Sequence, residues 1–250
     1  MILPAAFLNR PLAHRGLHDK TAGRPENSPG AFQAAVDAGY GIELDVQISA
    51  DGRAMVFHDY DLGRLTAEKG PIALRTAADL GQIPLNHSTD TIPTLAQVLA
   101  LVAGRAALLI EIKDQDGAVG PNVGPLEAAI ASDLAGYAGP VAVMSFNPHS
   151  VAEMARLAPN VPRGLTVGGA GDSTYRNVKP ARIAELTEIA DFDPVGACFI
   201  SHDRALLGRA SVTRLKSRGV PIICWTVRSP AQETEARRIA DNITFEGYPA

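Results

Sequence analysis

Short runs of apolar and β-branched residues alternate along this chain with longer segments of helical periodicity. The short runs predict strands at 11–14, 41–46, 54–58, 107–113, 141–146, 163–167, 197–202, 221–227 and 243–245. The longer segments predict helices at 29–38, 94–103, 126–135, 149–157, 182–190, 204–217 and 229–240. Strands that alternate with helices indicate a mostly parallel sheet covered by helices.

At 250 residues, such a chain is expected to close into an α/β (β/α)8 TIM barrel. Nine strands are one too many for this fold, and no helix separates 41–46 from 54–58. Asp51-Gly52 lies between these two runs and predicts a two-residue hairpin turn, which would place residue 45 opposite residue 58. We therefore expect one domain over 1–250, with a β-hairpin extension of strand two. An inserted segment follows at 60–92, with at most a short helix at 74–80 and a role as a lid or wall.

Charged residues gather where the first predicted strands end. They are His14 and Arg15 after the first strand, Glu43 and Asp45 on the second, and Glu111 and Lys113 on 107–113. Strand alternation places Glu43 and Asp45 on one face, and Glu111 and Lys113 likewise. In (β/α)8 barrels the carboxyl ends of the strands carry the active site. This pattern predicts a catalytic centre there.

Three carboxylates that converge at the mouth of a barrel repel one another unless a cation neutralises them. Glu43, Asp45 and Glu111 therefore predict a divalent cation, calcium or magnesium, because these ions prefer carboxylate oxygens. The absence of cysteine nearby argues against zinc. The alternative is that the carboxylates only form salt bridges with Arg15 and Lys113. Salt bridges alone could account for any one of these carboxylates, but they account less well for three of them at the ends of neighbouring strands.

His14 and His58 are the histidines expected next to this cluster, and histidine suits proton transfer near neutral pH. A phosphodiester needs one group to accept a proton and another to donate one. Arg15 and Lys113 offer positive charge for phosphate oxygens. The other histidines that we considered are expected to have structural roles, namely His18, His87, His149 and His202. Trp225 either lines the pocket or fills the top of the barrel.

Two strings, AHRGLHDKTAGRPENSPGAF and GIELDVQISADGRAMVFHD, resemble the glycerophosphodiester phosphodiesterase family. The matching motifs are His14-Arg15-Gly16, Glu26-Asn27-Ser28, Glu43 with Asp45, His58-Asp59 and Glu111 with Lys113. Their order and spacing both fit, and the resemblance extends from about Leu12 to Pro249. It implies a metal-dependent barrel hydrolase that releases an alcohol and glycerol phosphate from a small-molecule glycerophosphodiester.

The resemblance also implies roles for individual residues. Metal ligands are expected at Glu43, Asp45 and Glu111, general acid and base at His14 and His58, and substrate-site residues at Arg15, Lys113, Glu26, Asn27 and Trp225. Two departures from the family pattern are Arg228, in place of asparagine, and Phe245-Glu246, in place of Thr-Asp-x-Pro. We expect both to lie away from the metal set and to affect substrate choice. Arg228 could reach an anionic headgroup, but a surface arginine that begins a helix is the favoured interpretation.

The net charge of −4 argues against a nucleic-acid-binding or anionic-membrane-binding protein, and no apolar stretch predicts stable membrane insertion. The chain begins without a recognisable secretory signal, so a cytoplasmic location is expected. Cys198 and Cys224 lie in apolar runs and are expected to be reduced core thiols. Two alternative functions remain open. One is a lipid-directed phosphodiesterase, lysophospholipase-D-like or sphingomyelinase-D-like, and the other is a non-catalytic barrel that binds phosphate esters.

Overall fold

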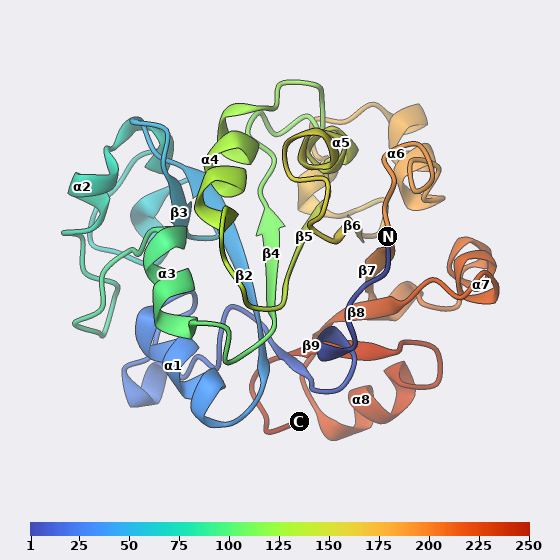
Figure 1. Ribbon diagram of the computed structural model, residues 1–250, viewed down its shortest axis with the longest axis horizontal. Coiled ribbons are helices and arrows are strands. Elements are labelled where there is room, and N and C mark those ends of the chain that lie inside the picture. Colours follow the sequence, from blue (N-terminus) through green and yellow to red (C-terminus); the bar gives the residue numbers. More distant parts are fainter.

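The computed structural model describes residues 1–250, and its parallel strands close into a barrel (Figure 1). Closure occurs at β1 (Leu12–Ala13), which pairs with both β2 (Gly41–Ile48) and β9 (Asn242–Phe245). The other parallel strands follow in order: β4 (Leu108–Ile112), β5 (Val141–Ser145), β6 (Arg163–Val167), β7 (Phe199–Asp203) and β8 (Ile222–Val227). The predicted (β/α)8 barrel is thus confirmed.

Helices lie between successive strands and cover the outside of the barrel (Figure 1). They are α1 (Pro29–Asp37), α3 (Leu95–Val102), α4 (Pro125–Leu134), α5 (Pro148–Leu157), α6 (Pro180–Thr187), α7 (Ala210–Ser217) and α8 (Pro230–Ala236). Local signals determine where some of them begin. The Ser28 hydroxyl accepts from the Ala31 N–H at the start of α1. The helix predicted at 204–217 divides into a 3-10 turn, Arg204–Leu206, and α7, and Gly208 lies between the two.

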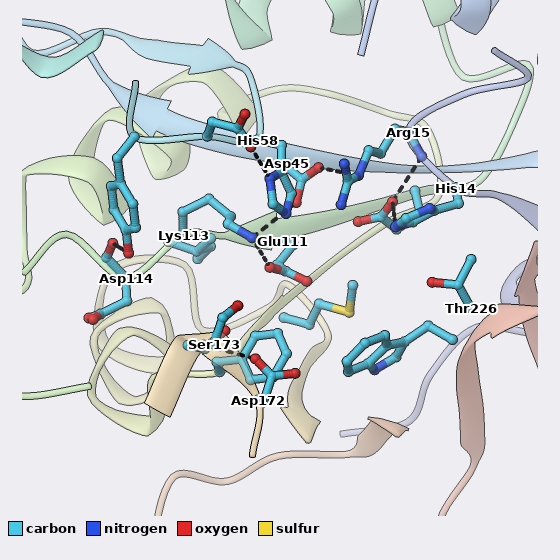
Figure 2. A pocket seen from close by; sticks show the side chains of 18 of the residues that line it. His14, Arg15, Asp45, His58, Glu111, Lys113, Asp114, Asp172, Ser173 and Thr226 are labelled. Atoms are coloured by element: carbon cyan, nitrogen blue, oxygen red, sulfur yellow. Dashed lines mark hydrogen bonds and ion pairs between the residues drawn. The ribbon is translucent and has the colours of Figure 1, made fainter. Parts of the chain in front are cut away.

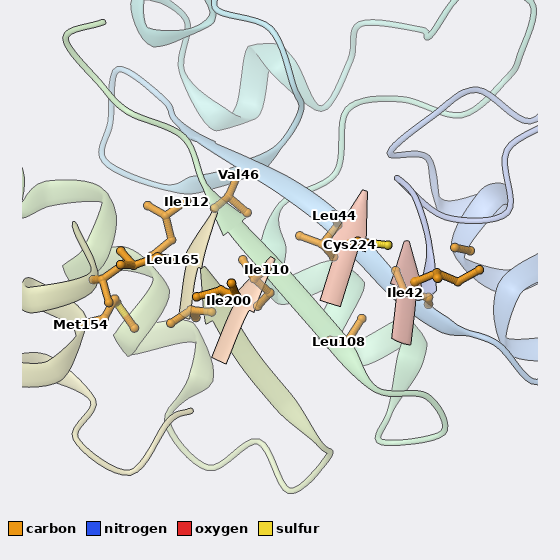
Figure 3. Close-up of a cluster of buried hydrophobic side chains, with 14 of the residues drawn as sticks. Ile42, Leu44, Val46, Leu108, Ile110, Ile112, Met154, Leu165, Ile200 and Cys224 are labelled. Carbon is orange, nitrogen blue, oxygen red and sulfur yellow. The ribbon is translucent and has the colours of Figure 1, made fainter. Parts of the chain in front are cut away.

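The barrel has two apolar layers. The larger lies between strands and helices and includes Ile42, Leu44 and Ile110 (Figure 3). The smaller fills the amino-terminal half of the barrel interior, where Leu109 packs with Phe7 from the start of the chain. Along the strands, polar side chains alternate with the apolar ones of the outer layer and therefore point into the barrel. Because apolar residues fill its amino-terminal half, these polar side chains lie at the carboxyl end.

The hairpin after β2 exists, but the predicted two-residue turn is wrong. β3 (Ala54–Val56) is antiparallel to β2, with Ile48 opposite Ala54. The Ser49 N–H donates to the Arg53 carbonyl at 3.0 Å, so the loop between them has three residues. Gly52 alone in this loop has a positive φ, 75°, whereas the predicted turn needs two such residues. This shifts the register by one.

As a result, residue 45 lies opposite residue 57 rather than 58. The Phe57 N–H donates to the Asp45 carbonyl at 3.0 Å. Phe57 packs into a separate apolar cluster. His58 follows the end of the strand and enters the site from a loop instead of from the ladder.

Residues 60–92 contain the 3-10 turns Leu62–Arg64 and Ile72–Leu74 and the short helix α2 (Ala77–Leu80). The helix predicted at 74–80 is therefore shorter than expected. This segment has its own apolar core with the hairpin, formed by Met55, Phe57, Leu62, Leu65, Ile72, Leu80, Ile83, Leu85 and Ile92. Figure 1 shows α2 at the edge of the molecule, outside β3.

Candidate active site

A cavity of about 760 Å³ opens at the carboxyl ends of the strands (Figure 2). Its lining includes Glu111 from β4, Met144 from β5, Trp225 from β8 and Thr244 from β9. The inserted segment contributes another wall through Tyr60, Asp61 and Arg64.

Glu43, Asp45 and Glu111 form a buried carboxylate cluster at one side of this cavity. Their side chains converge because β2 and β4 are adjacent and parallel, with Asp45 in register with Glu111. One oxygen from each carboxylate lies within 4.8 Å of the others, and the residues are 2%, 2% and 7% exposed. The three carboxylates could together hold a metal ion.

The charges in this cluster are unevenly compensated. Glu43 receives the Arg15 N–H at 3.0 Å, and the Nε2 of His14 lies 4.0 Å from its carboxylate. Burial and the neighbouring carboxylates Asp45 and Glu111 raise the pKa of Glu43 well above its ordinary value. A bound divalent cation would relieve this conflict, and an all-oxygen donor set suits a hard cation such as calcium or magnesium. The residues therefore fit such an ion.

Arg15 and Lys113 supply positive charge beside the cluster. Lys113 Nζ lies 2.7 Å from Glu111 and 3.4 Å from Asp45, and Arg15 Nε lies 3.3 Å from Asp45. Burial alone would raise the pKa of Asp45, but the charges of His58, Lys113 and Arg15 lower it far below its ordinary value. The side chains of Arg15 and Lys113 also line the cavity, so their positive charges face a bound ligand.

Left-handed backbone positions explain the His-Arg-Gly and Glu-Asn-Ser motifs. Gly16 has a φ of 78°, and a Cβ there would lie 2.9 Å from the Ala31 Cβ. Arg15 and Asn27 also have positive φ values, and the Asn27 N–H donates to the Arg15 carbonyl at 2.8 Å. This turn aims Arg15 at the carboxylate cluster.

Glu26 and Asn27 lie behind the cavity wall and do not line it. The Glu26 carboxylate accepts from Arg15 at 2.6 Å and from Arg64 at 2.7 and 2.8 Å, and these hydrogen bonds and charges lower its pKa to about 2 despite burial. The Asn27 amide donates to Asp45 at 2.9 Å. Both residues thus hold charged groups that line the cavity.

His58 lies on the side of the cavity formed by the inserted segment (Figure 2). Its Nδ1 is 2.6 Å from the carboxylate of Asp59. Asp59 in turn accepts two hydrogen bonds from Arg64, at 2.5 and 3.0 Å. His58 is thus held by residues that are close to it in the sequence.

His14 has a carboxylate partner that the sequence did not indicate. Its Nδ1 lies 2.5 Å from Glu246, which follows β9, and Glu246 also accepts from Arg228 at 2.7 Å. Arg228 and Glu246 were expected to lie away from the metal set, and neither pairs with Glu43, Asp45 or Glu111; Arg228 nevertheless lines the cavity, and Glu246 contacts His14. His18, which was expected to have a structural role, lies with its Nε2 3.5 Å from Glu246. No motif places these residues together, because strands at opposite ends of the chain meet only when the barrel closes.

The wall opposite the carboxylate cluster contains Asp172 and Ser173, which had no clear sequence signal, and Trp225, which was expected either to line the pocket or to fill the top of the barrel. Ser173 begins a 3-10 turn, Ser173–Tyr175, and Asp172 caps that turn; both side chains line the cavity (Figure 2). Trp225 lines the cavity, and its indole N–H donates to the Ser201 carbonyl at 3.0 Å. The Phe146 ring meets the Trp225 ring edge-on at 5.6 Å. The turn signal in Gly-Asp-Ser-Thr could have indicated the loop, but not its position.

The model of the glycerophosphoryl diester phosphodiesterase family matches residues 14–243. A glycerophosphodiester phosphodiesterase of Bacillus altitudinis is 41% identical over 108 residues, covering 40% of this chain and 43% of that protein. One from Caldanaerobacter subterraneus is 30% identical over 164 residues, covering 62% of this chain and 65% of that protein. The matched stretches thus span less than two thirds of the length of both relatives.

Solved structures share the fold over almost the whole chain. A phosphodiesterase of Oleispira antarctica, in complex with the product sn-glycerol-3-phosphate, has a TM-score of 0.79 and 23% identity. The alignment covers 98% of this chain and 95% of that one.

None of the helices of this chain has the length and apolar character needed to span a membrane.

Proposed function

Because the chain belongs to the glycerophosphoryl diester phosphodiesterase family, we propose that it hydrolyses glycerophosphodiesters to an alcohol and glycerol 3-phosphate. The observation that carries this proposal is one cavity in which two histidines border three buried carboxylates. Relatives named as glycerophosphodiester phosphodiesterases and the product complex of the Oleispira antarctica enzyme support the same reaction.

Glu43, Asp45 and Glu111 would hold a calcium or magnesium ion. When bound, this ion supplies positive charge that stabilises the phosphate as negative charge develops on it. Arg15 and Lys113 bind the non-bridging phosphate oxygens from the same side, and their pairing with Asp45 and Glu111 keeps them charged and in place.

His14 and His58 transfer the protons. One histidine accepts the proton of the attacking water, and the other donates a proton to the alcohol oxygen that leaves. If a glycerol hydroxyl attacks first, the alcohol leaves in the same way, and water then opens the cyclic phosphate to glycerol 3-phosphate. Both rings have one nitrogen occupied by a carboxylate, which leaves the other nitrogen for the reaction.

Glu26, Asn27 and Trp225 complete the substrate site in different ways. Glu26 and Asn27 act indirectly, because they hold Arg15 and Asp45 in position from behind the wall. Trp225 offers an apolar surface against which part of the substrate packs.

A small-molecule substrate fits the cavity rim better than a lipid. A lipid-directed enzyme needs an apolar rim for the acyl chain. The exposed large apolar side chains are Met1, Ile2, Tyr60 and Leu74, and of these only Tyr60 lines the cavity. A non-catalytic barrel would have no reason to keep both histidines beside the carboxylate cluster.

The test follows the products of glycerophosphoethanolamine by phosphorus NMR, with and without chelator. We expect glycerol 3-phosphate and free ethanolamine, no turnover in excess EDTA, and recovery on addition of calcium or magnesium. Glu43→Gln and Glu111→Gln should lose activity and ion binding measured by calorimetry, with the fold retained by circular dichroism.

Asp193→Asn serves as the control, because this carboxylate pairs with Arg218 on the surface and does not line the cavity. Undiminished turnover in EDTA would refute the role of the cation. Phosphoethanolamine as the product would refute the proposed bond cleavage.

A further inference from the structure

Glu246, which follows β9, contacts both β8 and the residue that follows β1. Its N–H donates to the Val227 carbonyl at 3.0 Å, which ties it to β8, and its side chain reaches the residue that follows β1. The contact with His14 spans 232 positions in the sequence. The position of the His14 ring thus depends on the residue that follows β9 as well as on its own strand, β1.

The contact also determines which nitrogen of His14 is free. The hydrogen bond from His14, together with His18 and Arg228, lowers the pKa of Glu246 far below its ordinary value although burial alone would raise it. An ionised carboxylate only accepts hydrogen bonds, so the Nδ1 of His14 must carry a hydrogen. The unprotonated nitrogen is then Nε2, which lies 4.0 Å from the Glu43 carboxylate, on the side of the cluster.

Arg228 and His18 hold Glu246 in this position. Arg228 Nε donates to Oε1 at 2.7 Å, while His14 and His18 share Oε2, at 2.5 and 3.5 Å. His14, His18 and Glu246 have donor atoms close enough to hold a metal. However, the Arg228 charge already balances this carboxylate, whereas the carboxylate cluster contains Glu43 without such a partner. The contacts therefore favour a positioning role.

We propose that Glu246 is a positioning residue that fixes the tautomer and ring orientation of His14, with Arg228 and His18 as its anchors. The proposal rests on the proposed function, in which the Nε2 of His14 transfers a proton. It assigns a joint role to the two residues that depart from the family pattern, since Arg228 and Glu246 contact each other.

The test is Glu246→Gln. The amide retains the size of the side chain but can donate to Nδ1 as well as accept from it, so the tautomer is no longer fixed. We expect kcat for glycerophosphoethanolamine to fall by about 10–100-fold, by analogy with the usual cost of losing a partner that orients a metal-ligating histidine. KM should change little, because Glu246 does not line the cavity. Glu246→Asp keeps the charge on a shorter side chain and should lose less activity.

A double-mutant cycle distinguishes positioning from a structural role. In a His14→Ala background, Glu246→Gln should cause no further loss of kcat, because the residue through which it acts is gone. Asp193→Asn, which removes another arginine-paired carboxylate, should leave kcat unchanged in both backgrounds.

Three outcomes would overturn the proposal: full activity in Glu246→Gln, multiplicative losses in the double mutant, or a parallel loss of thermal stability that accounts for the effect. If instead the unsubstituted protein released no glycerol 3-phosphate from glycerophosphoethanolamine, the proposed function itself would fail.

Discussion

The two histidines of the cavity have the same kind of partner but are held in different ways. His14 is 13% exposed, and its carboxylate partner Glu246 comes from the far end of the chain. His58 is 30% exposed, and its partner Asp59 is the next residue. One pair depends on barrel closure, and the other is built within a single loop.

The arginines behind these carboxylates extend the comparison. Arg228 makes one contact with Glu246 and is 57% exposed. Arg64 is 44% exposed and donates to both Asp59 and Glu26. The pair formed by His58 and Asp59 is therefore more exposed, but the arginine behind it makes more hydrogen bonds. Packing limits the motion of the less exposed pair, so Glu246 needs less support from its arginine, whereas the more exposed Asp59 depends on Arg64 for its position.

The largest expected effect comes from removing the rings themselves. His14→Ala and His58→Ala should each lower kcat by about 10²–10⁴-fold, the usual contribution of one general acid or base. The losses should not multiply in the double variant, since both residues serve one proton-transfer sequence. Steady-state kinetics measure this, with His149→Ala, an exposed position outside the cavity, as the control. Full activity in either single variant would leave that histidine with only a structural role.

A smaller effect is expected from removing the arginines. Arg64→Ala should lower kcat by up to about 10-fold, and Arg228→Ala by less, because partly exposed ion pairs contribute only about 0–1 kcal/mol each and Arg64 has the larger set of contacts. Increasing salt should reduce the difference. Comparing kcat of both variants at low and high ionic strength checks this. A larger loss of kcat for Arg228→Ala than for Arg64→Ala would mean that the less exposed pair, His14 and Glu246, depends more strongly on its arginine.

The smallest effect concerns His202, a buried histidine without a carboxylate partner. It is 0% exposed, its Nδ1 lies 3.0 Å from the Asp203 carbonyl, and burial lowers its pKa below the ordinary 6.5. The unfolded chain therefore binds more protons below pH 6.5, so the free energy of unfolding should decrease as the pH falls below that value. One proton accounts for at most about 1.4 kcal/mol per pH unit.

Urea unfolding between pH 7.5 and 5.5 measures this dependence. His202→Asn should flatten it, whatever its own effect on stability at pH 7.5, and His149→Asn should leave it unchanged because that residue is exposed. An identical pH dependence in His202→Asn and the unsubstituted protein would show that another group is responsible.

Local patterns were enough to predict most of the fold. Alternation placed Glu43 and Asp45 on one face of β2, and Glu111 and Lys113 on one face of the run that contains β4. Helical periodicity predicted α1 and α3, which begin at the caps Ser28 and Thr94. The hairpin register could not be predicted, because Asp51-Gly52 is compatible with more than one loop length. Two hydrogen bonds select the three-residue loop: the Ser49 N–H donates to the Arg53 carbonyl, and the Arg53 N–H donates to the Ser49 hydroxyl.

The sequence by itself determined the barrel and brought His58 next to Asp59, because strand periodicity, helix caps and adjacent residues act over short distances. Only the tertiary structure decided that Glu246 faces His14 and that Asp172 lies on the opposite wall. Contacts of this kind leave no local pattern, since they depend on how the last strand meets the first. The free energy that holds them comes from closing the whole sheet rather than from any one segment.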